Sequence, residues 1–98
     1  MPVKVVAIVP ARPDGEDEFV AAAKTCATAS RAEEGVLSYE LWREAAGERR
    51  FVFNELYRDQ AAVDAHMASD HFRAFAMAAR DLAGGRPDII VTHAIDVP

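Results

Sequence analysis

The chain has 98 residues, 51% of them hydrophobic, and a net charge of −5. This length suits one domain, spanning residues 1–98, with a single core and little apolar surface to spare. The acidic balance and the dispersed arginines argue against nucleic acid as a partner. The longest apolar run is far shorter than the roughly 20 residues of a membrane-spanning helix, so no membrane partner is expected. Because the N-terminal residues lack the pattern of a signal peptide, we expect a cytoplasmic protein.

The first third of the chain predicts a strand followed by a helix. Residues 3–9 are β-branched and apolar on both faces, which is typical of a central strand covered on each side. Two prolines and a glycine in residues 10–15 end this strand. The acidic residues 16–18 then fit the first turn of a helix, where the dipole favours negative charge, and this helix should run to about Glu33.

The only cysteine, Cys26, falls within this helix. A single cysteine excludes an intrachain disulfide and a metal cluster built on several cysteines. Its neighbours are small, so we interpret Cys26 as a buried structural residue rather than a reactive thiol.

Two strands follow the helix. Residues 36–43 predict a strand with Leu37, Tyr39 and Leu41 on one face, and residues 45–48 predict a turn. The next strand places aromatic residues and one carboxylate on a single face, because side chains alternate along a strand. The residues of this face are Phe51, Phe53, Glu55 and Tyr57.

Two helices and a last strand complete the chain. Asp59 is placed as the N-cap of a helix with Ala62, Val63 and His66 on one side. Ser69 or Asp70 caps a second helix, whose apolar stripe includes Phe72 and Phe75. After the glycines at 84 and 85, residues 88–95 predict the last strand, on which His93 is interpreted as half-buried.

The resulting order is β-α-β-β-α-α-β, which predicts an antiparallel sheet with its helices on one face. The other face would then carry Val6, Ile8, Val52, Leu56 and Ile90. Leaving this face in water would expose a large apolar patch. Burial against a second copy of the chain is the simplest remedy, so a homodimer is expected.

The order and spacing of residues across the chain resemble a known family. The resemblance rests on two runs, Glu33-x-Gly35-x-Leu37-x-Tyr39 and Phe51-x-Phe53-x-Glu55-x-Tyr57-x-Asp59-x-Ala61-Ala62-x-x-Ala65-His66-x-x-Ser69-x-His71-Phe72. These runs are similar to those of the antibiotic biosynthesis monooxygenase (ABM) domain family, a group of small quinol monooxygenase-like proteins. The resemblance implies an α+β ferredoxin-like domain that pairs with itself into a dimeric α/β barrel and uses no cofactor. A related heme-degrading branch has a histidine ligand where this chain has Ala76, so heme ligation of that type is not expected.

Glu55 and His66 are the leading candidates for catalysis. If the first of the two helices folds back onto the aromatic face, both side chains enter the space between sheet and helices, where a carboxylate is costly unless it is paired. We therefore predict that Glu55 pairs with His66. The pair could remove a proton from a phenolic substrate, or it could simply anchor helix to sheet. The residue types alone leave both interpretations open.

Aromatic residues around this pair are candidates for substrate binding. A flat aromatic ligand could stack among six side chains, or these could be core and dimer contacts. The six candidates are Phe53, Tyr57, His71, Phe72, Phe75 and Trp42. No metal site is expected, because His66 and His71 have no third ligand at a fixed offset in the sequence.

Three functions are compatible with these residues. The first is a cofactor-independent oxidation of a quinol or polyphenol by dioxygen, with His66 and Glu55 in the pocket. The second is a dimeric module that binds a small aromatic molecule without catalysis. The third is isomerisation or breakdown of a small oxygenated metabolite on the same fold.

Overall fold

The protein is described by a computed structural model that covers residues 1–47 and 49–98. The element order is β-α-β-β-α-α-β, as predicted for the ferredoxin-like α+β fold. The elements are β1 (Val3–Pro10), α1 (Glu16–Arg31), β2 (Val36–Arg43), β3 (Arg50–Tyr57), α2 (Gln60–Met67), α3 (Asp70–Leu82) and β4 (Asp88–His93).

The four strands form one antiparallel sheet in the order β2-β3-β1-β4. The apolar first strand lies between β3 and β4, which confirms the prediction of a central strand. Val5 lies opposite Glu55 on one side and Val91 on the other. The side chains of these three residues therefore share one face of the sheet, which we call the inner face.

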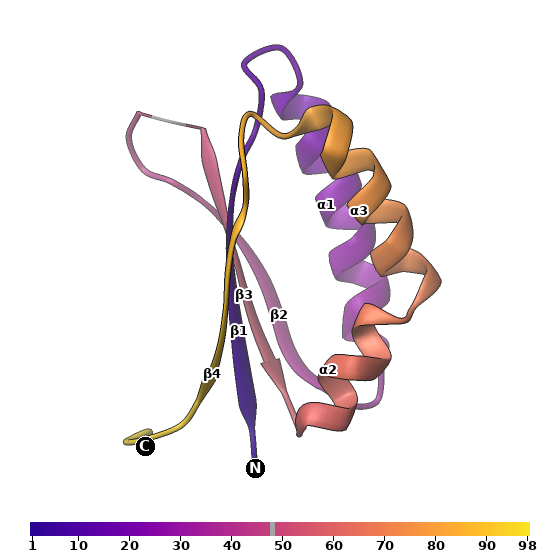
Figure 1. Cartoon of the computed structure of the whole chain (residues 1–98), viewed down its shortest axis with the longest axis vertical. Helices are drawn as coiled ribbons and strands as arrows, with labels where there is room; N and C mark the ends of the chain where they lie inside the picture. The colour runs from indigo at the N-terminus through magenta and orange to yellow at the C-terminus, as the bar shows by residue number, and fades with distance from the viewer. Residues whose placement is uncertain (48) are drawn as a thin grey trace.

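All three helices lie on the inner face (Figure 1). Side-chain caps set where the second and third helices begin: the Asp59 carboxylate accepts a hydrogen bond from the backbone N–H of Ala62, and the Ser69 hydroxyl accepts one from Phe72. These caps satisfy backbone donors that the first helical turn leaves unpaired. They also fix the short link between α2 and α3, with His66 just before it in α2 and His71 just after it in α3.

The core between sheet and helices is aromatic. Phe19 of α1 packs against Phe51 of β3, with ring centroids 5.0 Å apart, and against Phe75 of α3 at 5.8 Å. Phe75 in turn lies 5.4 Å from Phe53. Cys26 is buried in α1, as predicted, and burial raises the pKa of its thiol.

Local predictions for two segments differ from the structure. Leu37 was expected beside Tyr39, but a bulge between Val36 and Ser38 leaves Leu37 exposed. The last strand ends at His93, which is exposed rather than half-buried. The predicted turn at residues 45–48 includes Glu48, which lies outside the described residues.

The opposite, outer face of the sheet carries several apolar side chains, and among the described residues no helix packs on it (Figure 1). Val6, Ile8 and Leu56 are half-buried there. Trp42 and Ile90 are 59% and 54% exposed. Among the described residues, no helix is both long enough and apolar enough to cross a membrane.

Gly35 fixes the approach of α2 to the start of β2. A Cβ atom added at Gly35 would lie 2.4 Å from the Cβ of Ala62. We predict that Gly35→Ala lowers the free energy of unfolding by about 1–3 kcal/mol, because the overlap forces α2 away from the sheet. Urea denaturation measures this change.

Gly85→Ala is the matched control, since a Cβ there would meet only Pro10 at 3.4 Å. Both substitutions remove the same backbone freedom from the unfolded chain. Equal stability of the two variants would contradict the proposed overlap.

Candidate functional site

A cavity of about 420 Å³ lies between the inner face of the sheet and α3. Its walls are mostly apolar, and β1 and β4 supply Val5, Ala7, Ile89 and Val91. Five of the predicted site residues also line it: Phe53, Glu55, Tyr57, Phe72 and Phe75. A largely apolar cavity with a few polar groups is the usual form of a small-molecule site.

Glu55 is the acidic group in the wall of this cavity. Its side chain points inward because β3 alternates, and the residue is only 7% exposed. The Tyr57 hydroxyl donates a hydrogen bond of 2.5 Å to Glu55 Oε1. Burial raises the pKa of Glu55 from 4.5 to about 7, the Tyr57 hydrogen bond lowers it in part, and the charge of Glu33 raises it further. Glu55 can therefore accept or release a proton near neutral pH.

Two tyrosines beside Glu55 remain protonated. Burial, reinforced by the nearby Glu55 carboxylate, raises the pKa values of Tyr39 and Tyr57 well above their usual range. Both hydroxyls are therefore hydrogen-bond donors or acceptors at neutral pH. Tyr39 also lines the cavity, so the polar side chains of the wall are those of Glu55, Tyr39, Tyr57 and Arg80.

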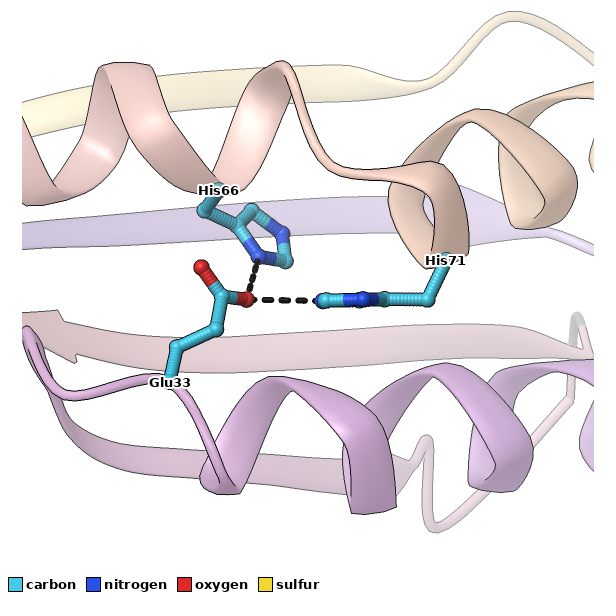
Figure 2. Close-up of side chains that lie close together, drawn as sticks. All are labelled: Glu33, His66 and His71. Atoms are coloured by element: carbon cyan, nitrogen blue, oxygen red, sulfur yellow. Dashed lines mark hydrogen bonds and ion pairs between the residues drawn. The ribbon is translucent and has the colours of Figure 1, made fainter.

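His66 is buried, as predicted, but its partner is not Glu55. His66 Nδ1 lies 2.8 Å from Glu33 Oε2, and His71 Nε2 lies 2.7 Å from the same oxygen. Figure 2 shows the three side chains converging from the turn after α1, from α2 and from the start of α3. We call these three residues the Glu33 cluster. The predicted Glu55–His66 pair is wrong, because each residue has a different hydrogen-bond partner.

The His66 ring lies behind the aromatic wall of the cavity. Its centroid is 5.5 Å from that of Tyr39, 5.6 Å from Tyr57 and 5.2 Å from Phe72. Within the described part of the chain, the residues that line the cavity include these three rings but not His66. The imidazole thus supports the wall rather than forming it.

Two other predicted ligand contacts lie away from the cavity. Trp42 is on the outer face, where it pairs with Val52 and donates a hydrogen bond to Glu40. Its predicted contact with a ligand in this cavity is wrong. Side chains alternate along β2, so Trp42 points to the opposite face of the sheet from Tyr39 and Leu41. His71 belongs to the Glu33 cluster. Sequence reasoning missed Glu33 as a site residue, although it begins the motif that carries the family resemblance.

Comparison with known proteins agrees with this architecture. The family model described as Antibiotic biosynthesis monooxygenase (ABM) matches residues 2–78. The chain belongs to the ABM family. Its match contains β1 to β3, α2 and most of α3, and therefore every residue of the Glu33 cluster together with Glu55 and Tyr57.

Relatives of this ABM protein come from several bacteria. It is 31% identical over 87 residues to a Bacillus subtilis protein named "Putative monooxygenase YcnE", covering 89% of this chain and 92% of that one. It is 32% identical over 81 residues to an uncharacterised Synechocystis protein, covering 83% of this chain but only 55% of the relative. The structure of Rv0793 from Mycobacterium tuberculosis superposes with a TM-score of 0.94 at 31% identity, covering 99% of this chain and 98% of that one.

The raised pKa of Glu55 makes a prediction about stability. The folded state holds the Glu55 proton more tightly than the unfolded state, so stability falls as pH rises from 4.5 through about 7. At about 1.4 kcal/mol per pKa unit, ionising Glu55 costs the folded state on the order of 3 kcal/mol. We expect Glu55→Gln to remove this loss between about pH 5 and pH 8, measured by urea denaturation at each pH.

Glu34→Gln is the control, because the Glu34 side chain is 94% exposed. This variant should keep the wild-type dependence on pH. A Glu55→Gln variant whose stability falls as steeply as that of wild type would show that Glu55 does not have a raised pKa.

Proposed function

We propose that this ABM protein is a cofactor-independent oxygenase that acts on a quinol or polyphenol bound in the cavity. The family and the names of its relatives support the reaction class. The aromatic and apolar walls support a flat aromatic substrate. The observation that carries the proposal is a carboxyl group with a pKa of about 7 in a cavity whose walls are mostly apolar.

Glu55 is the proposed base. As a carboxylate it accepts the proton of a substrate hydroxyl, which leaves an electron-rich phenolate in the cavity. Tyr57 donates to one oxygen of Glu55 and so holds the carboxylate in place, with the other oxygen free to meet the substrate. The apolar walls exclude water from the anion and strengthen its interaction with the two tyrosine hydroxyls.

The oxidation needs no group beyond substrate and dioxygen. The phenolate carbon gives electrons to dioxygen, and a carbon–oxygen bond forms at a ring C–H position. One oxygen atom stays on the ring as a carbonyl and the other leaves as water, so a hydroquinone becomes a hydroxyquinone. Phe53, Phe72 and Phe75 would hold the ring by stacking and by edge contacts.

His66 is proposed as a positioning residue rather than a proton acceptor for the substrate. Its ring packs against Tyr39 and Tyr57, and its Nδ1 bond to Glu33 fixes the ring orientation. Replacing this ring would loosen the two tyrosines that face the substrate. Replacing His66 would thus affect turnover indirectly, by changing the wall of the cavity.

Oxygen consumption tests the proposed reaction. Purified protein should consume dioxygen with simple hydroquinones, and kcat/KM should rise with pH and level off above an apparent pKa of about 7. Glu55→Gln should lower kcat by a factor on the order of 10² to 10⁴, the usual contribution of a positioned base. The Glu34→Gln variant should retain the wild-type rate.

Other outcomes point to different functions. Undiminished turnover in Glu55→Gln would remove Glu55 from the mechanism. Saturable binding of hydroquinones without oxygen uptake would indicate a binding module. Conversion of a substrate without oxygen uptake would indicate an isomerase on the same fold.

We also propose that the protein is a homodimer that buries the outer face of the sheet. That face carries exposed Trp42 and Ile90 beside half-buried Val6, Ile8 and Leu56, and none of the three helices covers it. An apolar area of this kind on a small protein is typical of an interface. A second copy would present the same surface, which suits a two-fold contact.

A charge on the outer face should separate the subunits. We expect Ile90→Asp to convert the dimer to a monomer in sedimentation and light-scattering measurements, because a carboxylate would be buried without a partner. Met77→Asp is the control, since Met77 is exposed on α3. A wild-type protein that is monomeric at micromolar concentration would contradict the proposed dimer.

A further inference from the structure

We propose that Glu33, His66 and His71 bind a divalent transition-metal ion of the Zn²⁺ type. This site lies outside the cavity and none of the three residues is assigned a contact with the substrate, although His66 also positions Tyr39 and Tyr57 of the cavity wall. The sequence alone did not indicate it, since two histidines five residues apart lacked a third ligand. The fold supplies that ligand, Glu33, from the turn between α1 and β2.

The three donor atoms converge on one point. One donor atom of each of Glu33, His66 and His71 lies within 4.8 Å of the donor atoms of the other two. Two donors that are each about 2.1 Å from a tetrahedral ion lie about 3.4 Å apart. The two Glu33–imidazole distances, 2.8 and 2.7 Å, would therefore lengthen by well under 1 Å to admit an ion. Small rotations of the Glu33 side chain can supply this change.

The donor set favours Zn²⁺ or a similar ion over calcium or magnesium. Two imidazole nitrogens and one carboxylate oxygen form the protein ligands of many catalytic zinc sites and of non-heme iron sites. Calcium and magnesium prefer sites made of oxygen atoms. Three protein ligands also leave at least one coordination position for water or another small ligand.

The surroundings keep the ligands in place and leave a path to solvent. His66 is 1% exposed and is held by the rings of Tyr39, Tyr57 and Phe72. The side chains of Glu33 and His71 are 19% and 25% exposed, so an ion can enter from their side. The three ligands, one from the turn after α1 and one each from α2 and α3, are thus already oriented, which lowers the entropic cost of binding.

No competing cation occupies the Glu33 carboxylate. Within the described residues, its partners are the two imidazoles and no lysine or arginine pairs with it. An ionised carboxylate is only an acceptor, so each ring nitrogen that faces it carries a hydrogen. An ion would take the place of these two hydrogens, which move to the other ring nitrogens or to solvent.

Zinc titration of the whole chain tests the site. After treatment with a chelator, the protein should bind one Zn²⁺ per chain in calorimetry, and its thermal midpoint should rise with Zn²⁺ concentration, since the ion binds the folded state. Co²⁺ should give visible absorption bands of a site with nitrogen and oxygen ligands. His71→Ala should weaken Zn²⁺ binding by at least about tenfold, the lower end of the loss that even an outer-shell change produces.

Two controls separate this site from other effects. His93→Ala removes an exposed histidine outside the Glu33 cluster and should bind Zn²⁺ like wild type. Glu55→Gln should also bind Zn²⁺ normally, so loss of oxidation and loss of metal binding can be told apart. If His71→Ala fails to fold, Glu33→Gln, which keeps the size of the side chain, replaces it. Absence of binding to wild type, or equal binding by wild type, His71→Ala and Glu33→Gln, would overturn the proposal.

Discussion

The structure depends on a carboxyl group held in an aromatic wall. Glu55 lies between Phe53 and Tyr57 on the inner face of β3, where an unpaired charge would be strongly disfavoured. One hydrogen bond from Tyr57 offsets only part of the cost of burying this charge. The part that is not offset raises the pKa of Glu55 to about 7. A residue that only stabilised the fold would be better replaced by an apolar side chain, so this arrangement favours a functional role.

A second carboxylate, that of the half-buried Glu33, has a different environment. It receives two imidazoles, whereas Glu55 receives one phenol. Its negative charge contributes to the raised pKa of Glu55, although burial of Glu55 is the larger cause. The two carboxylates therefore differ in their properties because their partners differ. Glu33 is held between two imidazoles, whereas Glu55 can exchange a proton. The His66 ring, which is one of the two partners of Glu33, packs against Tyr39 and Tyr57 beside Glu55.

Sequence reasoning could predict what depends on local periodicity. The alternation of β3 placed Phe53, Glu55 and Tyr57 on the inner face, and Asp59 and Ser69 marked the starts of α2 and α3. It could not predict which partner His66 would choose, because that depends on how far α1 and its following turn reach toward α2. Periodicity gives the face of a helix, but the contact between residues 33 and 66 is set by packing of whole elements. The bulge that leaves Leu37 exposed could not be predicted either, because no local residue pattern indicates it.

The proposed catalysis and the proposed association use opposite faces of the sheet. Odd-numbered residues of β3 face the helices and the cavity, whereas Val52, Asn54 and Leu56 face outward. Because alternation ties each side chain to one face, neighbouring residues of a single strand can serve different functions. A shift of register by one residue would exchange the two sets and place Glu55 on the apolar outer face. The long antiparallel pairing of β3 with β1, which fixes this register from Val3 to Pro10, is therefore as necessary for the site as the residues that line it.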